Sequence, residues 1–173
     1  MSGNVRPIVH YGDPVLHQRC TEVTEFDQEL AELVDDMFAS MYEADGVGLA
    51  ANQIGVNARV FVIDCPDDEG KHTVAHIVNP ELQAVEGERK LVLENEGCLS
   101  VPGEYTEVAR ADHAVVTGKD KNGKDITLEG TGFLARCLQH ETDHLNGTVY
   151  VDKLPKKVRK RLLKNAGLSE SNA

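Results

Sequence analysis

The clearest periodic pattern in the chain lies between Asp27 and Ala44. Apolar residues recur there at steps of three and four, which places them on one stripe of an α-helix. The stripe consists of Leu30, Leu33, Val34, Met37, Phe38, Met41 and Tyr42. Gly46 and Gly48 follow and interrupt the pattern. The sequence therefore predicts an amphipathic helix over residues 27–44.

Apolar runs in the middle of the chain predict strands. Residues 59–64 are typical of a buried strand, and residues 73–80 of a second strand that ends at its proline. Alternating stretches near residues 107–117 and 125–129 flank residues 121–124, where an Asn-Gly pair favours a tight turn. We therefore expect a hairpin between the last two stretches.

Two further helices are expected toward the C-terminus. One should span residues 131–144 and stop before an Asn-Gly pair. The next should begin with Pro155 and end near Gly167, leaving residues 168–173 as a frayed end. The pattern predicts one α+β domain over residues 1–173. Mixed or antiparallel strands would pack around the helix at 131–144, and a C-terminal helix would follow.

Composition narrows the class of protein. A chain with 40% hydrophobic and 27% charged residues is ordinary for a globular protein. The N-terminus lacks the apolar run of a secretory signal, and no stretch is long enough to span a bilayer, so we expect a cytoplasmic protein with no membrane partner. In that compartment the four cysteines are expected to be free thiols or metal ligands.

The formal charge of −11 is unevenly distributed. Residues 1–151 carry 27 acidic and 11 basic residues, a net charge of −16, which makes this part a poor partner for DNA. Residues 153–164 carry seven bases and no acid. One interpretation is a solvated amphipathic helix, residues 153–166, that packs on the body through Val158, Leu162 and Ala166. The other is a basic surface that docks on ribosomal RNA near nascent chains.

Candidate chemistry is concentrated in the predicted helix at 131–144. His140 and His144 project from one helical face, with a rise of roughly 6 Å between them, so both imidazoles can bind one metal ion. Glu141 lies beside them and can act as a base toward a water at the metal. The alternative is a helix with two solvated histidines. A third ligand is needed, and cysteine, aspartate and glutamate all remain candidates.

Cys137 shares the face of the two histidines but is a poor third ligand. It lies roughly 10 Å along the helix axis from His144, too far for one tetrahedral ion to bind both together with His140. Phe133 falls on the same stripe. Cys137 and Phe133 are therefore expected to form an apolar wall that suits a hydrophobic substrate side chain, with plain core packing as the alternative.

Two more stretches contain candidate site residues. Residues 94–103 place Cys98 after a glycine, where a cysteine can point into a site or remain a small buried hydrophobe. Residues 46–55 combine small residues with one amide, Gln53, which allows close approach to a ligand or simply a tight turn.

Together these three stretches resemble the peptide deformylase family. The family patterns are G-φ-G-φ-A-A-x-Q, E-G-C-φ-S and Q-H-E-x-D-H-φ-x-G, where φ is apolar. They occur here in that order at residues 46–53, 96–100 and 139–147, with every fixed position filled. The resemblance spans residues 46–147, most of the chain. Asp143 and Gln139 lie within the third motif but are not obvious ligands, and Asp143 could either support a ligand or cap nearby backbone.

The resemblance implies a site and a reaction. Cys98 would join His140 and His144 as the metal ligands, with Fe²⁺ expected and Zn²⁺ or Ni²⁺ possible, whereas the donor set alone would favour zinc. The substrate would be N-formylmethionine at the start of nascent polypeptides. Glu141 would be the base, and the Gln53 amide and the Leu99 N–H would stabilise the oxyanion.

The substrate would then lie along Val47 and Gly48, with its methionine side chain near Phe133 and Cys137. Two other classes compete with this interpretation. An H-E-x-x-H metalloprotease would cut internal peptide bonds, but it has no reason to contain the Cys98 and Gln53 motifs. A non-catalytic metal-binding module would need a fourth protein ligand, which these motifs do not supply.

Overall fold

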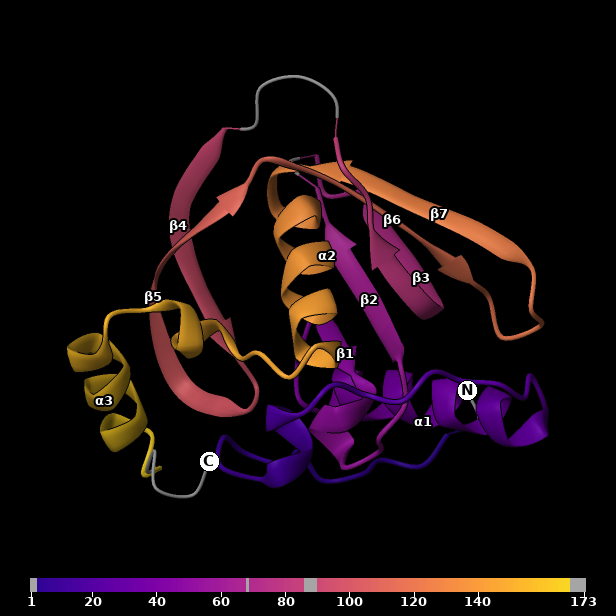
Figure 1. Cartoon of the computed structure of the whole chain (residues 1–173), viewed down its shortest axis with the longest axis horizontal. Helices are drawn as coiled ribbons and strands as arrows, with labels where there is room; N and C mark the ends of the chain where they lie inside the picture. Colours follow the sequence, from indigo (N-terminus) through magenta and orange to yellow (C-terminus); the bar gives the residue numbers. More distant parts are fainter. Residues whose placement is uncertain (1–2, 68, 86–89, 169–173) are drawn as a thin grey trace.

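Two antiparallel sheets enclose one helix in the computed structural model, which describes residues 3–67, 69–85 and 90–168 (Figure 1). The helices are α1 (Gln28–Glu43), α2 (Gly132–Leu145) and α3 (Lys156–Asn165), with short 3-10 turns η1 (Pro14–His17), η2 (Ala51–Ile54) and η3 (Tyr150–Lys153). The strands are β1 (Gly48–Ala50), β2 (Val60–Pro66), β3 (His72–Leu82), β4 (Leu91–Cys98), β5 (Val101–Ala111), β6 (His113–Lys119) and β7 (Asp125–Thr131). The larger sheet has the order β1-β2-β3-β6-β7, and the smaller one pairs β4 with β5. The predicted α+β class is confirmed, with antiparallel strands.

Strand β2 is buried on both faces, which divides the interior around it into two apolar cores. Val60 and Val62 pack with α1, whereas Phe61, Ile63 and Cys65 point to the opposite face and pack with α2. Successive side chains of a strand alternate between faces, so a nearly continuous apolar run is what a strand covered on both sides requires.

Helix α2 lies between the two sheets in Figure 1 and is buried on most of its circumference. It packs against strands of the larger sheet and against β5 of the smaller one. Its position confirms the expectation that strands pack around the helix at 131–144. It also explains why polar side chains such as His140, Glu141 and His144 lie in the interior of the molecule.

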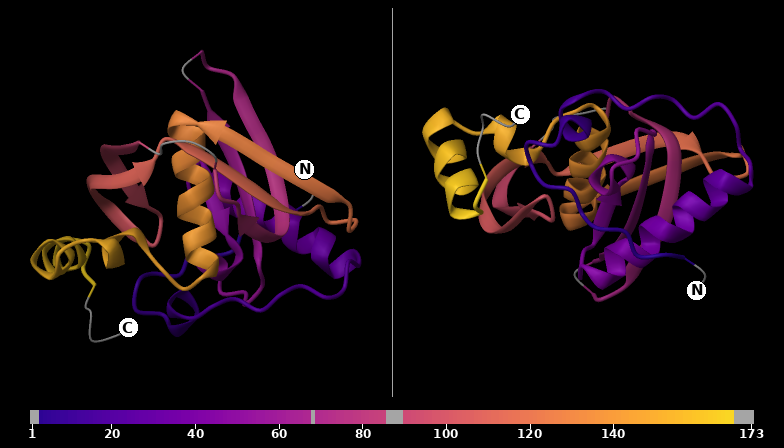
Figure 2. Two further views of the ribbon diagram at one scale, coloured as in Figure 1. Left: turned by 45° about the horizontal axis from the view of Figure 1, so that its top comes forward. Right: turned by 90° about the horizontal axis from the view of Figure 1, so that it is seen from below.

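The smaller sheet separates α2 from the C-terminal helix. Both views of Figure 2 show α3 beside β4 and β5, on the side away from the larger sheet. Leu162 and Leu163 bury against Val101, Val108 and η3 in a third apolar core. The predicted helix is confirmed, and the packing adds Leu163 to its buried face. Residues 169–173 lie outside the described part of the chain, whereas the Leu168 N–H bonds to the Leu163 carbonyl at 2.7 Å, so Leu168 is not frayed.

Several predicted strands differ from the structure. The stretch 107–117 is not one strand: β5 ends at Ala111 and β6 begins at His113 in the other sheet. Pro80 does not end β3, because the register against β6 shifts between Val78 and Glu81, and a bulge tolerates the missing N–H. Strands β1 and β4 and the first half of β5 carried no clear apolar alternation and were not predicted. The hairpin between β6 and β7 is confirmed.

Two remaining expectations concern thiols and membranes. None of the four cysteines forms a disulfide, which agrees with the expectation of free thiols or metal ligands. Within the described residues, no helix combines the length and the apolar character that crossing a membrane requires.

Candidate metal centre and pocket

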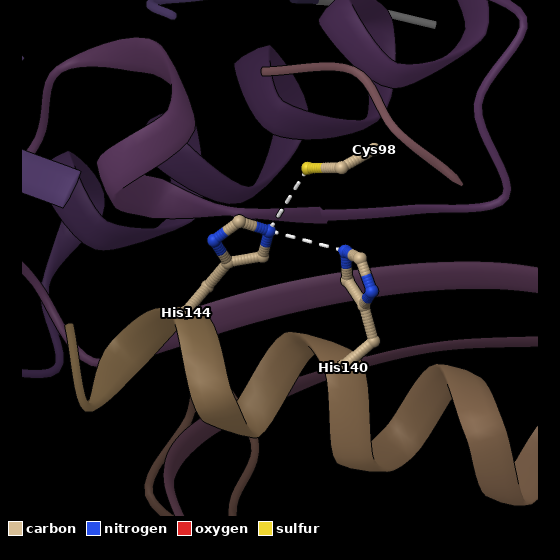
Figure 3. A group of neighbouring side chains, drawn as sticks. All are labelled: Cys98, His140 and His144. Atoms are coloured by element: carbon tan, nitrogen blue, oxygen red, sulfur yellow. Dashed lines mark hydrogen bonds between the residues drawn. The ribbon is translucent and has the colours of Figure 1, made fainter. Parts of the chain in front are cut away.

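Three potential metal ligands from two elements converge on one point (Figure 3). His140 and His144 project from α2, and Cys98 stands at the end of β4, where a register shift against β5 turns the chain. The Nε2 atom of His144 lies 3.2 Å from Cys98 Sγ and 3.1 Å from His140 Nε2. All three ligand atoms fall within 4.8 Å of one another.

This donor set fits a metal ion. Thiolate sulfur and imidazole nitrogen bind zinc at about 2.3 Å and 2.0 Å, so donors of one tetrahedral ion lie roughly 3.3–3.6 Å apart. The two distances from His144, 3.1 and 3.2 Å, are close to that range, and the remaining pair of donors lies within 4.8 Å. Three ligand atoms that direct their lone pairs at one another are best satisfied by a cation between them.

The His140 ring is oriented by a buried carboxylate. Its Nδ1 lies 2.6 Å from Glu96 Oε2, which leaves Nε2 to face Cys98 and His144. Arg110 holds the other side of Glu96 through Nε at 3.0 Å and Nη2 at 2.6 Å. Burial alone would raise the pKa of Glu96, but the hydrogen bonds from His140 and Arg110 outweigh burial and lower it to about 2. Glu96 is therefore a fixed negative charge behind the ligand.

The ion-pair network continues away from the ligands through Asp143. Arg110 Nη1 lies 2.5 Å from Asp143 Oδ2, and Lys153 Nζ lies 3.3 Å from the same oxygen. The sequence left the role of Asp143 open between supporting a ligand and capping backbone. The structure links it to His140 through Arg110 and Glu96, where it anchors the arginine that holds Glu96.

The two histidines differ in their electrostatic surroundings. Burial lowers the pKa of His144, which keeps that ring neutral and able to donate a lone pair to a metal. Burial acts in the same direction on His140, but its bonds to Cys98 and Glu96 outweigh burial and raise its pKa. The anionic groups around His140 thus favour a positive charge at the centre of the cluster formed by Cys98, His140 and His144.

Glu141 lies against strand β1 beside the cluster. A Cβ atom at Gly48 would come within 2.6 Å of Glu141 Oε2, so only glycine lets the carboxylate occupy this place. The other oxygen, Oε1, is buried and has no hydrogen-bond partner among the described residues. Burial raises the pKa of Glu141 to about 7. A carboxylate in this state can both accept and return a proton near neutral pH.

Two hydrogen-bond donors, the Gln53 amide and the Leu99 N–H, lie close to Cys98. Gln53 is 1% exposed, and its Oε1 accepts from the Ala50 N–H at 3.0 Å, which fixes the amide. Its Nε2 then points to Ser100 Oγ at 3.2 Å and to Cys98 Sγ at 3.5 Å. The N–H of Leu99, in the turn between β4 and β5, has no acceptor among the described residues.

A pocket of about 360 Å³ opens beside these groups. Cys98, His140 and Glu141 line its polar end, together with Gln53 and Leu99. Val47, Gly48, Phe133 and Cys137 line it as well, so the structure brings the sequence-predicted substrate residues to the same cavity. Phe133 is 42% exposed, whereas Cys137 is buried. Phe133 therefore faces the cavity, whereas Cys137 lines the cavity and also packs in the apolar core between α2 and the larger sheet.

The sequence did not predict the roles of some site residues. Glu96 stood inside the E-G-C motif, but no local pattern showed that it would meet a histidine 44 residues later. Ser100 ends the same motif but was given no role, whereas Arg110 had no signal at all. The sequence assigned no role to Gln139, and the structure shows that its side chain bonds to both the N–H and the carbonyl of Ala111, which ties the end of β5 to α2.

Comparison with known proteins gives the same family over most of the chain. Residues 5–160 match the family model described as polypeptide deformylase. Peptide deformylase 1 of Streptomyces avermitilis is 53% identical over 169 residues, which cover 97% of this chain and 78% of that protein. Peptide deformylase 2 of Streptomyces coelicolor is 56% identical over 162 residues, which cover 94% of this chain and 89% of that protein.

Solved structures agree with the sequence relatives. The crystal structure of peptide deformylase from Ehrlichia chaffeensis superposes with a TM-score of 0.87 at 37% identity, covering 94% of this chain and 95% of that one. A structure of the Ehrlichia chaffeensis enzyme in complex with actinonin gives a TM-score of 0.86 at 40% identity, with the same coverage. The likeness therefore extends to the whole arrangement of helices and sheets.

Proposed function

Because this chain belongs to the polypeptide deformylase family, we propose that Cys98, His140 and His144 hold one divalent metal ion at its reaction centre. The chain is an enzyme that removes the N-formyl group from nascent peptides by metal-dependent hydrolysis, which is the activity of this family. The alternative of a protease for internal peptide bonds is not favoured by these matches. The main support for a metal at this place is that the ligand atoms of the three side chains lie within 4.8 Å of one another beside the pocket.

The metal is expected to be Fe²⁺, with Zn²⁺ or Ni²⁺ as ions that the same donors accept. One thiolate and two imidazoles suit borderline divalent ions in general, and the family resemblance, rather than the donors, favours iron. When bound, the ion acts as a Lewis acid that polarises the formyl oxygen and lowers the pKa of a water toward neutrality.

Glu141 is proposed as the group that moves the proton. It would take a proton from the attacking water and return it to the amide nitrogen as the formyl C–N bond breaks, so that formate and a free amino terminus leave. Two features support this role. Its Oε1 has no other partner among the described residues, and the glycine at position 48 gives its carboxylate a fixed place beside the cluster.

Gln53 and Leu99 are proposed to stabilise the negative charge that develops on the formyl oxygen. The Gln53 amide is already oriented by Ala50 and Ser100, so it needs no rearrangement to donate an N–H toward the cluster. The Leu99 N–H follows Cys98 directly in the chain, and no acceptor among the described residues takes it. Donors oriented in advance lower the barrier because they cost no reorganisation during the reaction.

Val47 and Gly48 are proposed to bind the peptide backbone. Strand β1 is an edge strand, and the Val47 carbonyl already accepts from the Asp64 N–H at 2.9 Å on the sheet side. Because backbone groups alternate in direction along a strand, Gly48 faces the open edge, where an extended peptide can add as a further strand. The methionine side chain would then enter the apolar end of the pocket at Phe133 and Cys137.

The decisive experiment measures formate release from formyl-Met-Ala by protein loaded with Fe²⁺ without oxygen. We expect rapid release, no reaction with acetyl-Met-Ala, and loss of turnover in Glu141→Ala with metal content nearly intact. Full turnover in Glu141→Ala would remove Glu141 from the mechanism. Release that persists in Cys98→Ala with no metal bound would refute the proposed centre.

The basic C-terminal helix is proposed as a contact with the ribosome, where nascent chains emerge in the cytoplasm. Lys156, Lys157 and Lys160 are exposed, whereas Leu162 and Leu163 are buried against the body. Deleting the helix would therefore expose the core, so the test should change charge alone. Changing the three lysines to glutamine should weaken co-sedimentation with ribosomes and flatten its salt dependence. Changing three exposed lysines outside the helix, Lys71, Lys90 and Lys124, to glutamine should not, and equal binding by both variants would refute the contact.

A further inference from the structure

Asn52 is a buried amide next to the proposed metal centre that the proposed chemistry does not use. It lies in η2, directly before Gln53, and the residue is fully buried. Its Nδ2 donates to the His144 carbonyl at 2.6 Å and to the Val15 carbonyl at 3.5 Å. Because both neighbours are carbonyl oxygens, the amide nitrogen must face them, and Oδ1 points the other way.

The two consecutive amides of η2 contact both elements that supply the metal ligands. Asn52 bonds to the backbone of His144 on α2, and Gln53 Nε2 lies 3.5 Å from Cys98 Sγ at the end of β4. The distance between these two elements has to match the size of one ion. The turn η2 therefore contributes to the spacing of 3.2 Å between Cys98 Sγ and His144 Nε2.

The His144 ring has one nitrogen that does not face the cluster. Its Nε2 faces Cys98 and His140, and Figure 3 shows the other ring nitrogen, Nδ1, on the far side of the ring. A neutral imidazole that binds a metal through Nε2 carries its proton on Nδ1. An acceptor for this N–H fixes the orientation of the ring and makes it a stronger ligand. For His140 that acceptor is Glu96 Oε2, at 2.6 Å from Nδ1.

Asn52 Oδ1 is the acceptor that matches the His144 ring. His144 Nδ1 and Asn52 Oδ1 are both buried, and neither has a hydrogen-bond partner among the described residues. The third such atom is Glu141 Oε1, whose carboxylate lines the pocket. A buried donor and a buried acceptor left unpaired would each destabilise the folded protein. Pairing these two atoms satisfies both groups, and their residues are already joined by a hydrogen bond of 2.6 Å.

We propose that Asn52 is a positioning residue for the metal ligand His144. Its Nδ2 holds the His144 backbone, and its Oδ1 accepts the ring Nδ1–H, directly or through one bound water. Asn52 thus does for His144 what Glu96 does for His140, but without a charge. The inference rests on the proposed metal centre and adds the residue that orients its second histidine.

The test measures the affinity of the protein for Zn²⁺ by competition with a chelator. Asn52→Leu keeps the approximate volume but removes both polar atoms, so Kd for Zn²⁺ should rise 10- to 100-fold. The His144 carbonyl keeps its bond from the Gly147 N–H at 3.0 Å, so the end of α2 should remain folded. Asn79→Ala is the matched control, because Asn79 also bonds to backbone, at Val23, but does not line the pocket. It should lower thermal stability and leave Kd unchanged.

NMR of the Zn²⁺-loaded protein gives a readout that a loss of stability alone would not move. The Nδ1–H proton of His144 should shift upfield in Asn52→Leu, because it loses its acceptor, whereas the Nδ1–H proton of His140 should not move. Asn52→Asp removes the amide donor but offers a charged and stronger acceptor. In that variant the His144 proton should shift downfield.

An unchanged Kd in Asn52→Leu, or an equal loss of affinity in Asn79→Ala, would overturn the proposal. A His144 ring proton with the same resonance in the original protein, Asn52→Leu and Asn52→Asp would also overturn it. In each of these cases Zn²⁺ binding and formate release by the original protein would still support the proposed function. Absence of Zn²⁺ binding by the original protein would instead refute the proposed centre.

Discussion

At the scale of single residues, the site depends on a glycine as much as on its charged groups. Gly48 allows the Glu141 carboxylate to lie where a methyl group would come within 2.6 Å of Oε2. Gly48→Ala should therefore displace the carboxylate and lower kcat/KM by about a hundredfold, the cost typical of a misplacement of about 1 Å at a reacting group. Metal content and thermal stability should change little. Activity close to that of the original enzyme would show that Glu141 tolerates displacement.

Glu96 should control metal affinity rather than chemistry. Glu96→Gln keeps the shape of the side chain but removes the charge that orients His140 and pairs with Arg110. We expect metal binding to weaken 10- to 100-fold, the usual effect of losing a carboxylate behind a metal-binding histidine. Competition with a chelator measures it. Glu94→Gln, exposed two residues earlier on β4, is the control, and equal affinities in the two variants would contradict the role.

The sequence predicted the reacting groups but not the residues that orient them. A spacing of four along a helix is a local property, so it puts His140 and His144 on one face however the rest of the chain folds. Glu96, Arg110 and Asp143 meet only because β4, β5 and α2 pack together. Such contacts have no local signature, because each carboxylate or guanidinium by itself is indistinguishable from a solvated surface charge.

At the scale of elements, one buried carboxylate on α1 ties down the N-terminal segment. Asp36 accepts from the Asn4 N–H at 2.8 Å and from Arg6 at 2.6 and 3.0 Å. Asp36→Asn should reduce the free energy of unfolding by about 1.5–3 kcal/mol, the range for hydrogen bonds to a charged group. Chemical denaturation measures the loss. Glu32→Gln, exposed on the same helix, should have no comparable effect.

The same carboxylate predicts a dependence of stability on pH. Burial alone would raise the pKa of Asp36, but the bonds from Asn4 and Arg6 outweigh burial and lower it below the ordinary value of 3.8. The folded state therefore binds this proton less readily than the unfolded state. The stabilisation should be fully present above about pH 4 and should be lost as pH falls through the lowered pKa. An equal acid sensitivity of Asp36→Asn and the original protein would contradict this.

The elements that could be predicted are those with a strong local pattern. Helices α1 and α2, strand β2 and the β6–β7 hairpin have regular periodicity or a turn signal, and each appears where expected. Strands β4 and β5 lack a regular alternation of apolar and polar residues, because their exposed side chains include Leu91, Leu93 and Tyr105 among charged residues. Their pairing is decided by register and by the covering α2 and α3, which a single stretch of sequence does not reveal.

At the scale of the whole molecule, the metal should act as a cross-link between α2 and the β4–β5 sheet. Removing it leaves His140 and His144 on one element and Cys98 on another with no common partner. We expect the metal-free protein to unfold at a lower temperature, and metal at about 100 times its dissociation constant to restore roughly 2.7 kcal/mol. Calorimetry with and without chelator measures the difference.

His144→Ala provides the control for this prediction, because it removes a proposed ligand. Its unfolding temperature should be nearly the same with and without added metal. A metal-dependent shift of the original size in that variant would show that the stabilising ion binds elsewhere in the chain.

By itself, the sequence determined the α+β class, the principal helices, the family and the groups expected to perform the reaction. These follow from periodicity and from motifs whose members lie close together in the chain. Only the tertiary structure decided how Cys98 meets the histidines, which carboxylate orients His140, and which side chains line the pocket. Those contacts join residues distant in the sequence, and they are fixed by the burial of α2 between two sheets rather than by any local preference.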